Sequence, residues 1–406
     1  MRRVVSGVVF VLLVATSVQA QRRNGDGRMP PPQTPPPTAS PAAGQPLAGL
    51  TVAQRAQFAD GLDEFSGEED VNDGLGPLFN ERSCVACHSV PAVGGGSTRT
   101  VTRFARRANG VFDALANLGG SLMQDHAIGP ADGSLHTFNA EVVPATANIS
   151  IHRRTPPLFG LGLIDATPDS DFLALVQQEA ARRDGTTGRA PFVDNIRAGM
   201  KTVGKFGWKG QNPTLFQFAG DAYVNEMGIT SPDFPNENCP QGNCSELTFN
   251  PAPGINDDGA GPLALANYMT LLAAPPRGAQ NRDTDDGEST FDRIGCTACH
   301  VATFRSGSSP IAALDRKTYH PYSDFLLHDM GALGDGIEMG DANGREMRTA
   351  PLWGLRFITT YLHDGRAATL DQAILGHDGQ GRAARDQFAN LAPDAKAKLL
   401  AFLRSL

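Results

Sequence analysis

The sequence predicts a mainly α protein built from two related helical units with long Gly/Pro-rich loops. The pentapeptide Cys-x-x-Cys-His occurs twice, at residues 84–88 and 296–300. A second segment also recurs, since residues 154–164 and 348–358 agree at seven of eleven positions. Two segments that recur in the same order indicate two copies of one structural unit. Strand-like alternation of apolar and polar residues is scarce, which favours helices over sheets.

Two cysteines followed directly by a histidine form the attachment motif of c-type haem. In such a site the two thiols bind the vinyl groups of the porphyrin, and the histidine supplies an axial nitrogen to the iron. The sequence therefore predicts two covalently bound haem c groups, held by two triplets: Cys84, Cys87 and His88, and Cys296, Cys299 and His300. A four-cysteine zinc site or a dithiol redox pair would use the same cysteines, but neither explains a histidine after each pair.

The N-terminal residues predict export. Arg2 and Arg3 precede an apolar run over residues 4–15, which is too short to span a bilayer and is typical of a secretory signal. We therefore expect a signal peptide over residues 1–20 and a periplasmic location, with an uncleaved anchor as the alternative. Residues 21–46 are rich in Pro, Gly and Gln and predict a disordered linker. No other apolar stretch is long enough to cross a membrane, so no stable membrane insertion is expected after cleavage.

The rest of the chain is long enough for two or three packed units. We expect an N-terminal haem domain over residues 47–275 and a C-terminal haem domain over residues 276–406. The formal net charge is −8 and no long basic run occurs, which argues against a nucleic-acid partner. An acidic face would suit a basic electron-transfer partner, although acidity more often serves solubility.

Local patterns predict several individual elements. Residues 51–54 form a capping box, which indicates the start of a helix. Residues 393–406 begin with Pro and place apolar side chains on one broad face, so they predict a C-terminal helix. Cys239 and Cys244 are expected to form a disulfide in an oxidising compartment, with free thiols as the alternative. In the repeated segment, Pro breaks a helix and Gly permits a close approach, which we expect at the haem edge.

The second haem has a good candidate for its other axial ligand. Residues 369–372 form a capping box, and the helix that follows places His377 on its apolar face. His377 is therefore predicted to bind the second iron, with a buried core histidine as the alternative. His363 lies in the preceding turn and is expected to orient Asp364 or a haem propionate. Arg366 could pair with a propionate, because a guanidinium group matches a carboxylate.

The first haem has no comparable ligand. Three histidines lack a clear apolar helix face: His126, His136 and His152. Met123 and Met227 are also possible ligands, but a core or surface role is the better explanation for each of the five. We therefore expect this iron to be open or held by a displaceable group. Asp165 is the candidate distal acid that helps split a bound peroxide, with a surface or capping carboxylate as the alternative.

The tryptophans and the acidic loops allow further roles without requiring them. An aromatic ring between two haems can relay electrons, but core packing is the default role for Trp208 and Trp353. The acidic stretches at residues 257–258 and 283–286 could hold calcium, and exposed loops are commonly acidic as well.

Several stretches together resemble the bacterial di-haem oxidoreductase family, whose members are described as peroxidases or thiol oxidoreductases: residues 73–80, 83–88, 328–331, 348–354 and 361–367, and the helix before His377. The similarity covers about residues 47–406. A more distant resemblance links the chain to di-haem cytochrome c peroxidases, to di-haem enzymes that modify tryptophan in partner proteins, and to di-haem rubber oxygenases.

These resemblances imply two cytochrome c-like haem domains, with a peroxidatic haem in the first and an electron-transfer haem in the second. The chain also departs from the peroxidases. Those enzymes have a Met at the position of His377, so this chain implies a second haem with two histidine ligands and a lower potential. The distal His that the peroxidases have at the first haem has no evident match here.

The sequence as a whole predicts an exported di-haem c-type cytochrome oxidoreductase that couples electron transfer to peroxide reduction at the N-terminal haem. Its electron donor would be a small redox protein or a quinol-linked donor, and its oxidant hydrogen peroxide or dioxygen. Two alternatives remain open. One is a pure electron-transfer cytochrome, and the other is a di-haem oxygenase or partner-modifying enzyme.

Overall fold

A computed structural model describes residues 42–131 and 135–406. The predicted signal peptide and most of the predicted linker lie outside these residues. Contacts gather Ser40–Leu406 into one compact unit, and the predicted domain boundary after residue 275 stays a prediction. Within the described ranges, none of the helices combines the length and the apolar character that a membrane span requires.

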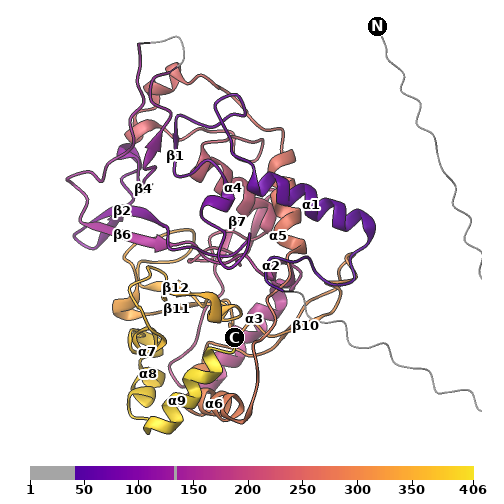
Figure 1. Ribbon diagram of the computed structural model, residues 1–406. Coiled ribbons are helices and arrows are strands. Elements are labelled where there is room, and N and C mark those ends of the chain that lie inside the picture. Colours follow the sequence, from indigo (N-terminus) through magenta and orange to yellow (C-terminus); the bar gives the residue numbers. More distant parts are fainter. Residues whose placement is uncertain (1–41, 132–134) are drawn as a thin grey trace, which may run out of the picture. The chain divides into compact units, whose positions relative to one another are not determined.

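The helices of the described residues fall into an earlier and a later group (Figure 1). The α-helices are α1 (Val52–Ser66), α2 (Leu161–Asp165), α3 (Asp169–Arg182), α4 (Leu215–Met227), α5 (Ala260–Leu271), α6 (Arg282–Arg293), α7 (Leu370–Leu375), α8 (Arg382–Ala389) and α9 (Pro393–Leu403). Short 3-10 helices are η1 (Cys84–Ala86), η2 (Ala116–Leu118), η3 (Pro240–Gly242), η4 (Cys244–Phe249), η5 (Cys296–Ala298), η6 (Gly331–Leu333), η7 (Leu355–Phe357) and η8 (Gly379–Gly381). Both haem-type motifs thus begin with a 3-10 turn.

The prediction of a mainly α fold is wrong, because the described residues are 34% helix and 16% strand. The strands are β1 (Leu78–Phe79), β2 (Thr100–Ala108), β3 (Val111–Asp113), β4 (Ser121–Leu122), β5 (His126–Ala127), β6 (Ile149–Arg154), β7 (Phe192–Asn195), β8 (Met200–Val203), β9 (Phe304–Arg305), β10 (Thr318–Tyr319), β11 (Leu327–Asp329) and β12 (Glu346–Arg348). The largest sheet is antiparallel, with β2 paired to β3, β4 and β6.

The β2–β6 pair escaped the sequence pattern because charged residues occupy its buried positions. Arg103 pairs with Ile151, and Val101 with Arg153. Arg153 is only 4% exposed. A half-buried strand is usually recognised in the sequence by apolar residues at every second position. The polar residues of this sheet therefore hide its period of two.

Several local predictions are confirmed. Thr51 caps α1 in a capping box with Gln54, and α9 begins at Pro393. Cys239 and Cys244 form the predicted disulfide.

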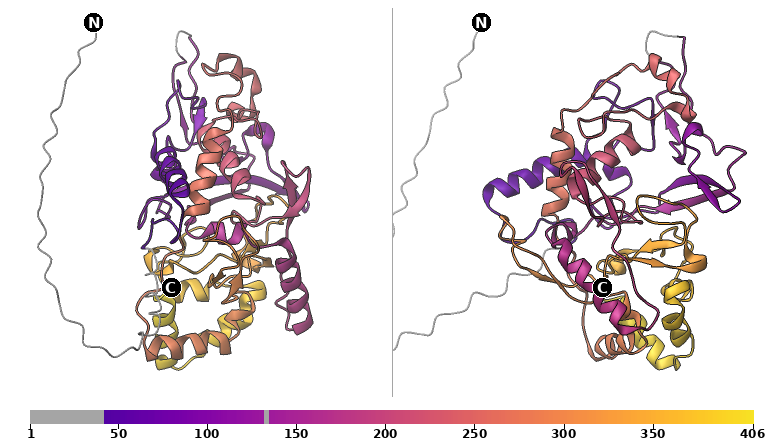
Figure 2. Two further views of the ribbon diagram at one scale, coloured as in Figure 1. Left: turned by 90° about the vertical axis from the view of Figure 1, so that its right-hand side faces the viewer. Right: turned by 180° about the vertical axis from the view of Figure 1, so that it is seen from behind.

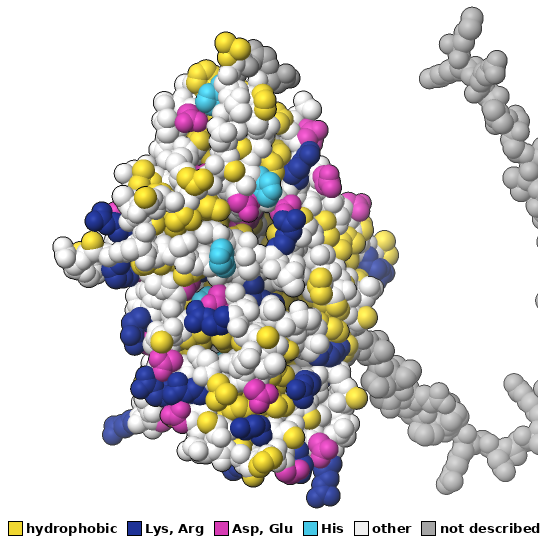
Figure 3. Space-filling view, turned by 60° about the vertical axis from the view of Figure 1, so that its left-hand side comes forward, with side chains coloured by type: hydrophobic (Ala, Val, Ile, Leu, Met, Phe, Trp, Pro, Cys, Tyr) yellow, Lys and Arg dark blue, Asp and Glu magenta, His cyan; other side chains and the backbone are white. Residues whose placement is uncertain are grey.

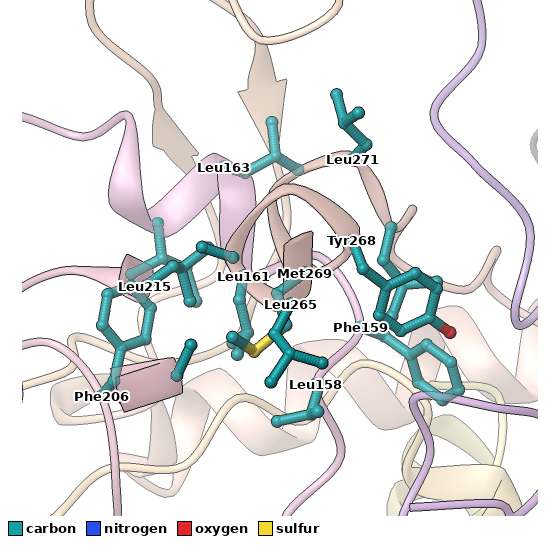
Figure 4. Close-up of a cluster of buried hydrophobic side chains, with 14 of the residues drawn as sticks. Leu158, Phe159, Leu161, Leu163, Phe206, Leu215, Leu265, Tyr268, Met269 and Leu271 are labelled. Atoms are coloured by element: carbon teal, nitrogen blue, oxygen red, sulfur yellow. The ribbon is translucent and has the colours of Figure 1, made fainter. Parts of the chain in front are cut away.

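Two hydrophobic cores support the unit. The larger one includes side chains of α2, α4 and α5, such as Leu161, Leu215, Leu265 and Met269, which converge in Figure 4. The smaller one lies between α6 and α9 and includes Phe402. In Figures 1 and 2 the later helices α6, α7, α8 and α9 gather at one end of the unit, away from α1, α4 and α5.

The two repeated segments adopt the same local structure. Strand β6 ends at Arg154 and β12 ends at Arg348. A glycine with positive φ follows in each segment, Gly160 at 73° and Gly354 at 77°, and each begins a helical turn. A Cβ at Gly160 would lie 2.8 Å from the Trp353 ring. The close approach in the first segment is therefore made to Trp353.

A buried ion cluster links residues from both sides of the predicted domain boundary. It consists of Arg153, Lys209 and Asp335 and is called the junction ion cluster. Arg153 and Lys209 contact the Asp335 carboxylate at 2.7 and 3.0 Å. The three side chains are at most 4% exposed. Lys209 also donates to the carbonyls of Asn343 and Glu346. Burial lowers the pKa of Lys209 to about 8, although Asp335 opposes that effect.

We expect Asp335→Ala to lower the free energy of unfolding by about 3–5 kcal/mol, because it leaves two buried cations without a counter-charge. Denaturant unfolding followed by far-ultraviolet circular dichroism measures this loss. The control is Asp194→Ala, which breaks the exposed ion pair with Lys201 and should cost about 1 kcal/mol or less. Equal losses in the two variants would contradict a structural role for the cluster.

Candidate haem sites

The second Cys-x-x-Cys-His motif lines a cavity of about 380 Å³. Cys296, Cys299 and His300 line it from η5, and His377 lines it from the residues after α7. Thr369 caps α7 by accepting from the Gln372 amide, as the sequence predicts. The helix ends at Leu375, so His377 follows the helix instead of lying within it.

His300 and His377 are placed to share a metal ion. Their ring centres are 6.4 Å apart. A metal held by two imidazole nitrogens at about 2.0–2.1 Å each places the ring centres about 6.4 Å apart. The distance between the two rings is therefore compatible with one metal ion between them.

Hydrogen bonds fix the protonation of three histidines. Each Nδ1 donates to a backbone carbonyl: His88 to Gly95 at 3.0 Å, His300 to Tyr322 at 2.8 Å and His377 to Ala373 at 2.8 Å. A carbonyl only accepts, so Nδ1 carries the proton and Nε2 keeps its lone pair for a metal. Burial lowers the pKa of His88 and His300 to about 4 and also lowers that of His377. All three are therefore neutral at neutral pH, as a ligand must be.

A fourth histidine of the second cavity is held differently. His328 contacts Asp324 at 2.8 Å and Gln380 at 2.6 Å. Burial lowers its pKa, but the Asp324 carboxylate raises it further, to well above the ordinary value. His328 also lies 3.6 Å from the Cys299 sulfur. This histidine is a charged neighbour of the motif cysteine, whereas His300 and His377 are neutral.

Cys84, Cys87 and His88 of the first motif line a smaller cavity of about 180 Å³. Its other walls are rich in charge: Arg103, Arg153, Arg154 and Glu226. Within the described residues, Nε of Arg103 and Nε of Arg154 are buried without a hydrogen-bond partner. A pair of carboxylates, such as haem propionates, would supply acceptors for them.

Glu226 and Glu81 are the carboxyl residues that line this first cavity, and Glu226 is the one that α4 supplies. The Glu226 Oε2 accepts from Asn80 Nδ2 at 2.7 Å. Burial raises the pKa of Glu226, while Asn80 and Arg103 oppose the rise. A buried carboxyl with a raised pKa, next to a haem-type motif, is a candidate for proton transfer.

A second internal repeat relates the two cavities. Residues 206–222 correspond at a constant offset to residues 361–377. Each segment opens with an antiparallel bridge, Phe206 with Asn212 and Tyr361 with Ala367. Each then turns at a glycine with positive φ and starts a helix capped by Thr, whose hydroxyl accepts from the Gln amide three residues later.

This correspondence pairs the two sites residue by residue. The counterpart of His377 is Ala222, which lines the first cavity. The position that holds the His377 imidazole in the second cavity thus holds a methyl group in the first. Glu226 lies one helical turn beyond Ala222, on the same face of α4.

Trp208 and Arg154 line both cavities. Trp208 is the counterpart of His363, and the two ring centres are 6.3 Å apart. Two reciprocal backbone hydrogen bonds also link the corresponding segments. Arg154 N–H donates to the His363 carbonyl at 2.8 Å, and Arg348 N–H donates to the Trp208 carbonyl at 3.0 Å. Trp208 therefore stands between the two sites, while Trp353 packs in the larger core.

The other predicted site residues lie elsewhere. Asp165 lines neither of the two cavities, and its role as distal acid stays a prediction. Burial raises its pKa to about 6. Arg366 is half exposed, pairs with Asp364 and lines neither cavity, so its contact with a propionate also stays a prediction. Of the further ligand candidates for the first iron, Met227 lines the first cavity.

Residues 145–406 match the sequence model of the family described as "Di-haem oxidoreductase, putative peroxidase". The chain belongs to this di-haem oxidoreductase family. Membership implies two haem groups and an oxidoreductase activity. The residues present fit two haems, because each motif stands beside a cavity with a neutral, oriented histidine and the first cavity carries unmatched guanidinium nitrogens.

Other relatives are more distant. The chain is 26% identical over 153 residues to cytochrome c551 peroxidase of Nitrosomonas europaea, a match that covers 35% of this chain and 42% of that protein. The chain thus spans less than half the length of this relative. Among solved structures, it is similar to Kuenenia stuttgartiensis hydrazine synthase (TM-score 0.40, 14% identity, 94% of this chain and 100% of the other). It is also similar to the diheme peroxidase BthA of Burkholderia thailandensis (TM-score 0.38, 15% identity, 86% of each chain).

Sequence reasoning missed three residues of this di-haem oxidoreductase. Ala222 and Glu226 lie on α4, and Arg103 lies on β2. The Thr-Leu-x-Gln pattern that starts both α4 and α7 could have revealed the counterpart of His377. Arg103 gave no signal, because its strand lacks apolar alternation.

Glu226 should make stability fall as pH rises. Its raised pKa means that the folded chain keeps a proton that the unfolded chain releases above about pH 4.5. The stability is therefore complete below that pH and is lost as pH rises through the folded pKa. We expect Glu226→Gln to match the wild type at low pH and to exceed it at higher pH. Denaturant unfolding at several pH values measures this, and a constant difference would contradict it.

Proposed function

We propose that this di-haem oxidoreductase reduces hydrogen peroxide at its first site and uses its second for electron transfer. The observation that carries the proposal is the asymmetry between Ala222 and His377. Two neutral histidines, His300 and His377, line the second cavity with their ring centres 6.4 Å apart. The first cavity is lined by His88, together with Ala222 and the buried carboxyl of Glu226. An open position can bind a small oxidant, and a position with two strong ligands mainly passes electrons.

The proposed holders are Cys84, Cys87 and His88 for the first haem, and Cys296, Cys299, His300 and His377 for the second. When bound, the first haem supplies an iron that takes up the oxidant and exchanges electrons with it. Covalent attachment of both groups as haem c rests on the two motifs.

Glu226 is the proposed acid–base group of the first site. It would take a proton from one oxygen of the peroxide and return it to the oxygen that leaves as water. Arg103 lies within electrostatic reach of Glu226 and can stabilise the negative charge that develops as the O–O bond breaks. Glu226 is better placed than Asp165 for this task, because it lines the cavity.

Trp208 is the proposed route between the sites, because it lines both cavities and lies beside His363. Export to the periplasm is proposed from the N-terminal signal pattern and agrees with the disulfide. A small redox protein or a quinol-linked donor would supply the electrons. The face in Figure 3 mixes acidic and basic side chains, so it is not uniformly acidic. Calcium binding stays a prediction.

The first experiment is low-temperature electron paramagnetic resonance on the ferric holoprotein, with and without peroxide. We expect one high-spin and one low-spin haem, with loss of the high-spin signal on addition of peroxide. Glu226→Gln should slow that loss by about 10²–10⁴-fold, the usual contribution of a positioned acid–base group. Two low-spin haems that ignore peroxide, even after one-electron reduction, would overturn the proposal and favour a pure electron carrier.

A pair of reciprocal variants tests the ligands. His377→Ala should convert the second haem to a high-spin spectrum, whereas a core histidine would leave that spectrum unchanged. Ala222→His should convert the first haem to a low-spin spectrum and weaken cyanide binding about tenfold or more, because the imidazole competes for the metal. Optical spectra of each ferric variant, with cyanide titrations, measure both effects. A first haem that stays high-spin in Ala222→His would show that Ala222 does not face the iron.

A further inference from the structure

Tyr223 follows Ala222 on α4 and lines the first cavity. Its side chain is only 3% exposed. Tyr223 and Cys84 both lie within electrostatic reach of Glu64 on α1. The phenol is therefore close to the haem-attachment edge of the first site, where the peroxide proposal gives it no role.

The Tyr223 hydroxyl donates a hydrogen bond to Glu64 Oε1. A nearby glycine makes room for this bond. A Cβ at Gly261 of α5 would lie 2.8 Å from the Tyr223 hydroxyl and 2.9 Å from Glu64 Oε1 and Asp257 Oδ2. The oxygens of Tyr223, Glu64 and Asp257 therefore surround a space that only a glycine at position 261 leaves free. One phenol and two carboxyl groups thus meet beside α5.

Glu64 connects this point with the surface. Its residue is half-buried, and Asp257 and Glu69 beside it are half-buried as well. Burial raises the pKa of Glu69 to about 7, and the charges of Glu64, Asp73 and Asp257 add to the rise. A proton that reaches Glu64 thus has further carboxyl groups near it and water close by.

Burial and the Glu64 carboxylate both raise the pKa of Tyr223, so its hydroxyl keeps the proton at any physiological pH. Removal of an electron from such a phenol requires that the proton leave at the same time. The carboxylate that accepts the hydrogen bond is already in place to receive it. Tyr223 and Glu64 therefore form a donor–acceptor pair for a coupled proton and electron.

We propose that Tyr223 carries single electrons from a reduced small redox protein into the first site, with Glu64 as its proton acceptor. The proposal rests on peroxide reduction there. In each step Tyr223 gives one electron to the oxidised site and its O–H proton to Glu64. The external donor then returns one electron to the phenoxyl oxygen, and Glu64 returns the proton. Two steps match one peroxide, whose O–O bond breaks to give two waters with two protons from solvent.

The alternative is that Tyr223 is a packing residue whose hydroxyl merely needs a partner. Tyr268 provides the matched control. It lies in the same core (Figure 4), is fully buried and lines neither cavity. Within the described residues its hydroxyl has no hydrogen-bond partner. Tyr268→Phe thus removes a core hydroxyl without touching a carboxyl group or the first cavity.

The experiment uses the full-chain holoprotein containing ring-deuterated tyrosine. The protein is mixed with hydrogen peroxide, frozen within milliseconds and examined by electron paramagnetic resonance. A nitroso spin trap followed by peptide mass spectrometry identifies the radical-bearing residue. In parallel, stopped-flow absorbance gives the rate of the peroxide reaction itself and the rate at which reduced basic cytochrome c is oxidised.

We expect a radical whose hyperfine pattern narrows on ring deuteration and whose trapped adduct lies at Tyr223. Tyr223→Phe and Glu64→Gln should abolish it and slow cytochrome oxidation about tenfold or more, with Tyr268→Phe unchanged. Glu64→Gln keeps an acceptor oxygen but cannot take the proton, so it tests the coupling even if Tyr223→Phe fails to fold.

The two proposals fail in different ways. If the wild-type protein does not react with peroxide, the proposed function fails. If it reacts but the radical and the cytochrome rate survive in both Tyr223→Phe and Glu64→Gln, the relay is overturned and peroxide reduction stands. A radical trapped at Trp208 alone would also overturn the relay, because the electrons would then enter from the second site.

Discussion

Two reciprocal backbone hydrogen bonds between the repeated segments are the constraint on which both sites depend. Arg154 N–H donates to the His363 carbonyl, and Arg348 N–H donates to the Trp208 carbonyl. Each bond ties the end of a strand in one half to the turn before the helix that lines the other half's cavity. The junction ion cluster sits beside these bonds and is expensive to break, because its charges are buried. The distance between the two sites is therefore set by hydrogen bonds and buried charge as much as by apolar packing.

On this shared frame the two sites differ by few side chains. The same bridge, turn and Thr cap deliver Ala222 to one cavity and His377 to the other. A histidine whose Nδ1 is held by a backbone carbonyl is a strong axial ligand, and a methyl group is none. The space that the methyl group leaves is lined by Glu226 and Arg103, which only the first cavity has. A duplicated unit can thus keep one copy for electron transfer and adapt the other to chemistry without a change of fold.

Local sequence signals predicted what depends on neighbouring residues. The haem motifs, the cap at Thr51, the C-terminal helix and the disulfide each rest on a few adjacent side chains, and the structure has the cap, the helix and the disulfide where they were expected. The β2–β6 sheet could not be predicted, because Arg103 and Arg153 occupy positions where buried apolar residues would have revealed a strand. Glu226 could not be found either, since a lone glutamate in a helix carries no signal until the fold brings it beside the motif. Asp165, the distal acid that the sequence suggests, follows the repeated segment in sequence but lines neither cavity.

The charges of the first cavity show why this region needs its cofactor. Arg153 is neutralised by Asp335, and the raised pKa of Glu226 leaves that carboxyl a weak counter-charge. Arg103 and Arg154 each have a buried Nε without a hydrogen-bond partner in the described residues. Buried cations of this kind cost stability unless an anion pairs with them. Haem propionates would supply that anion, so haem binding should stabilise the fold through electrostatics as well as through filling the cavity. The first cavity is thus lined both by guanidinium groups that would pair with haem propionates and by a carboxyl group suited to proton transfer.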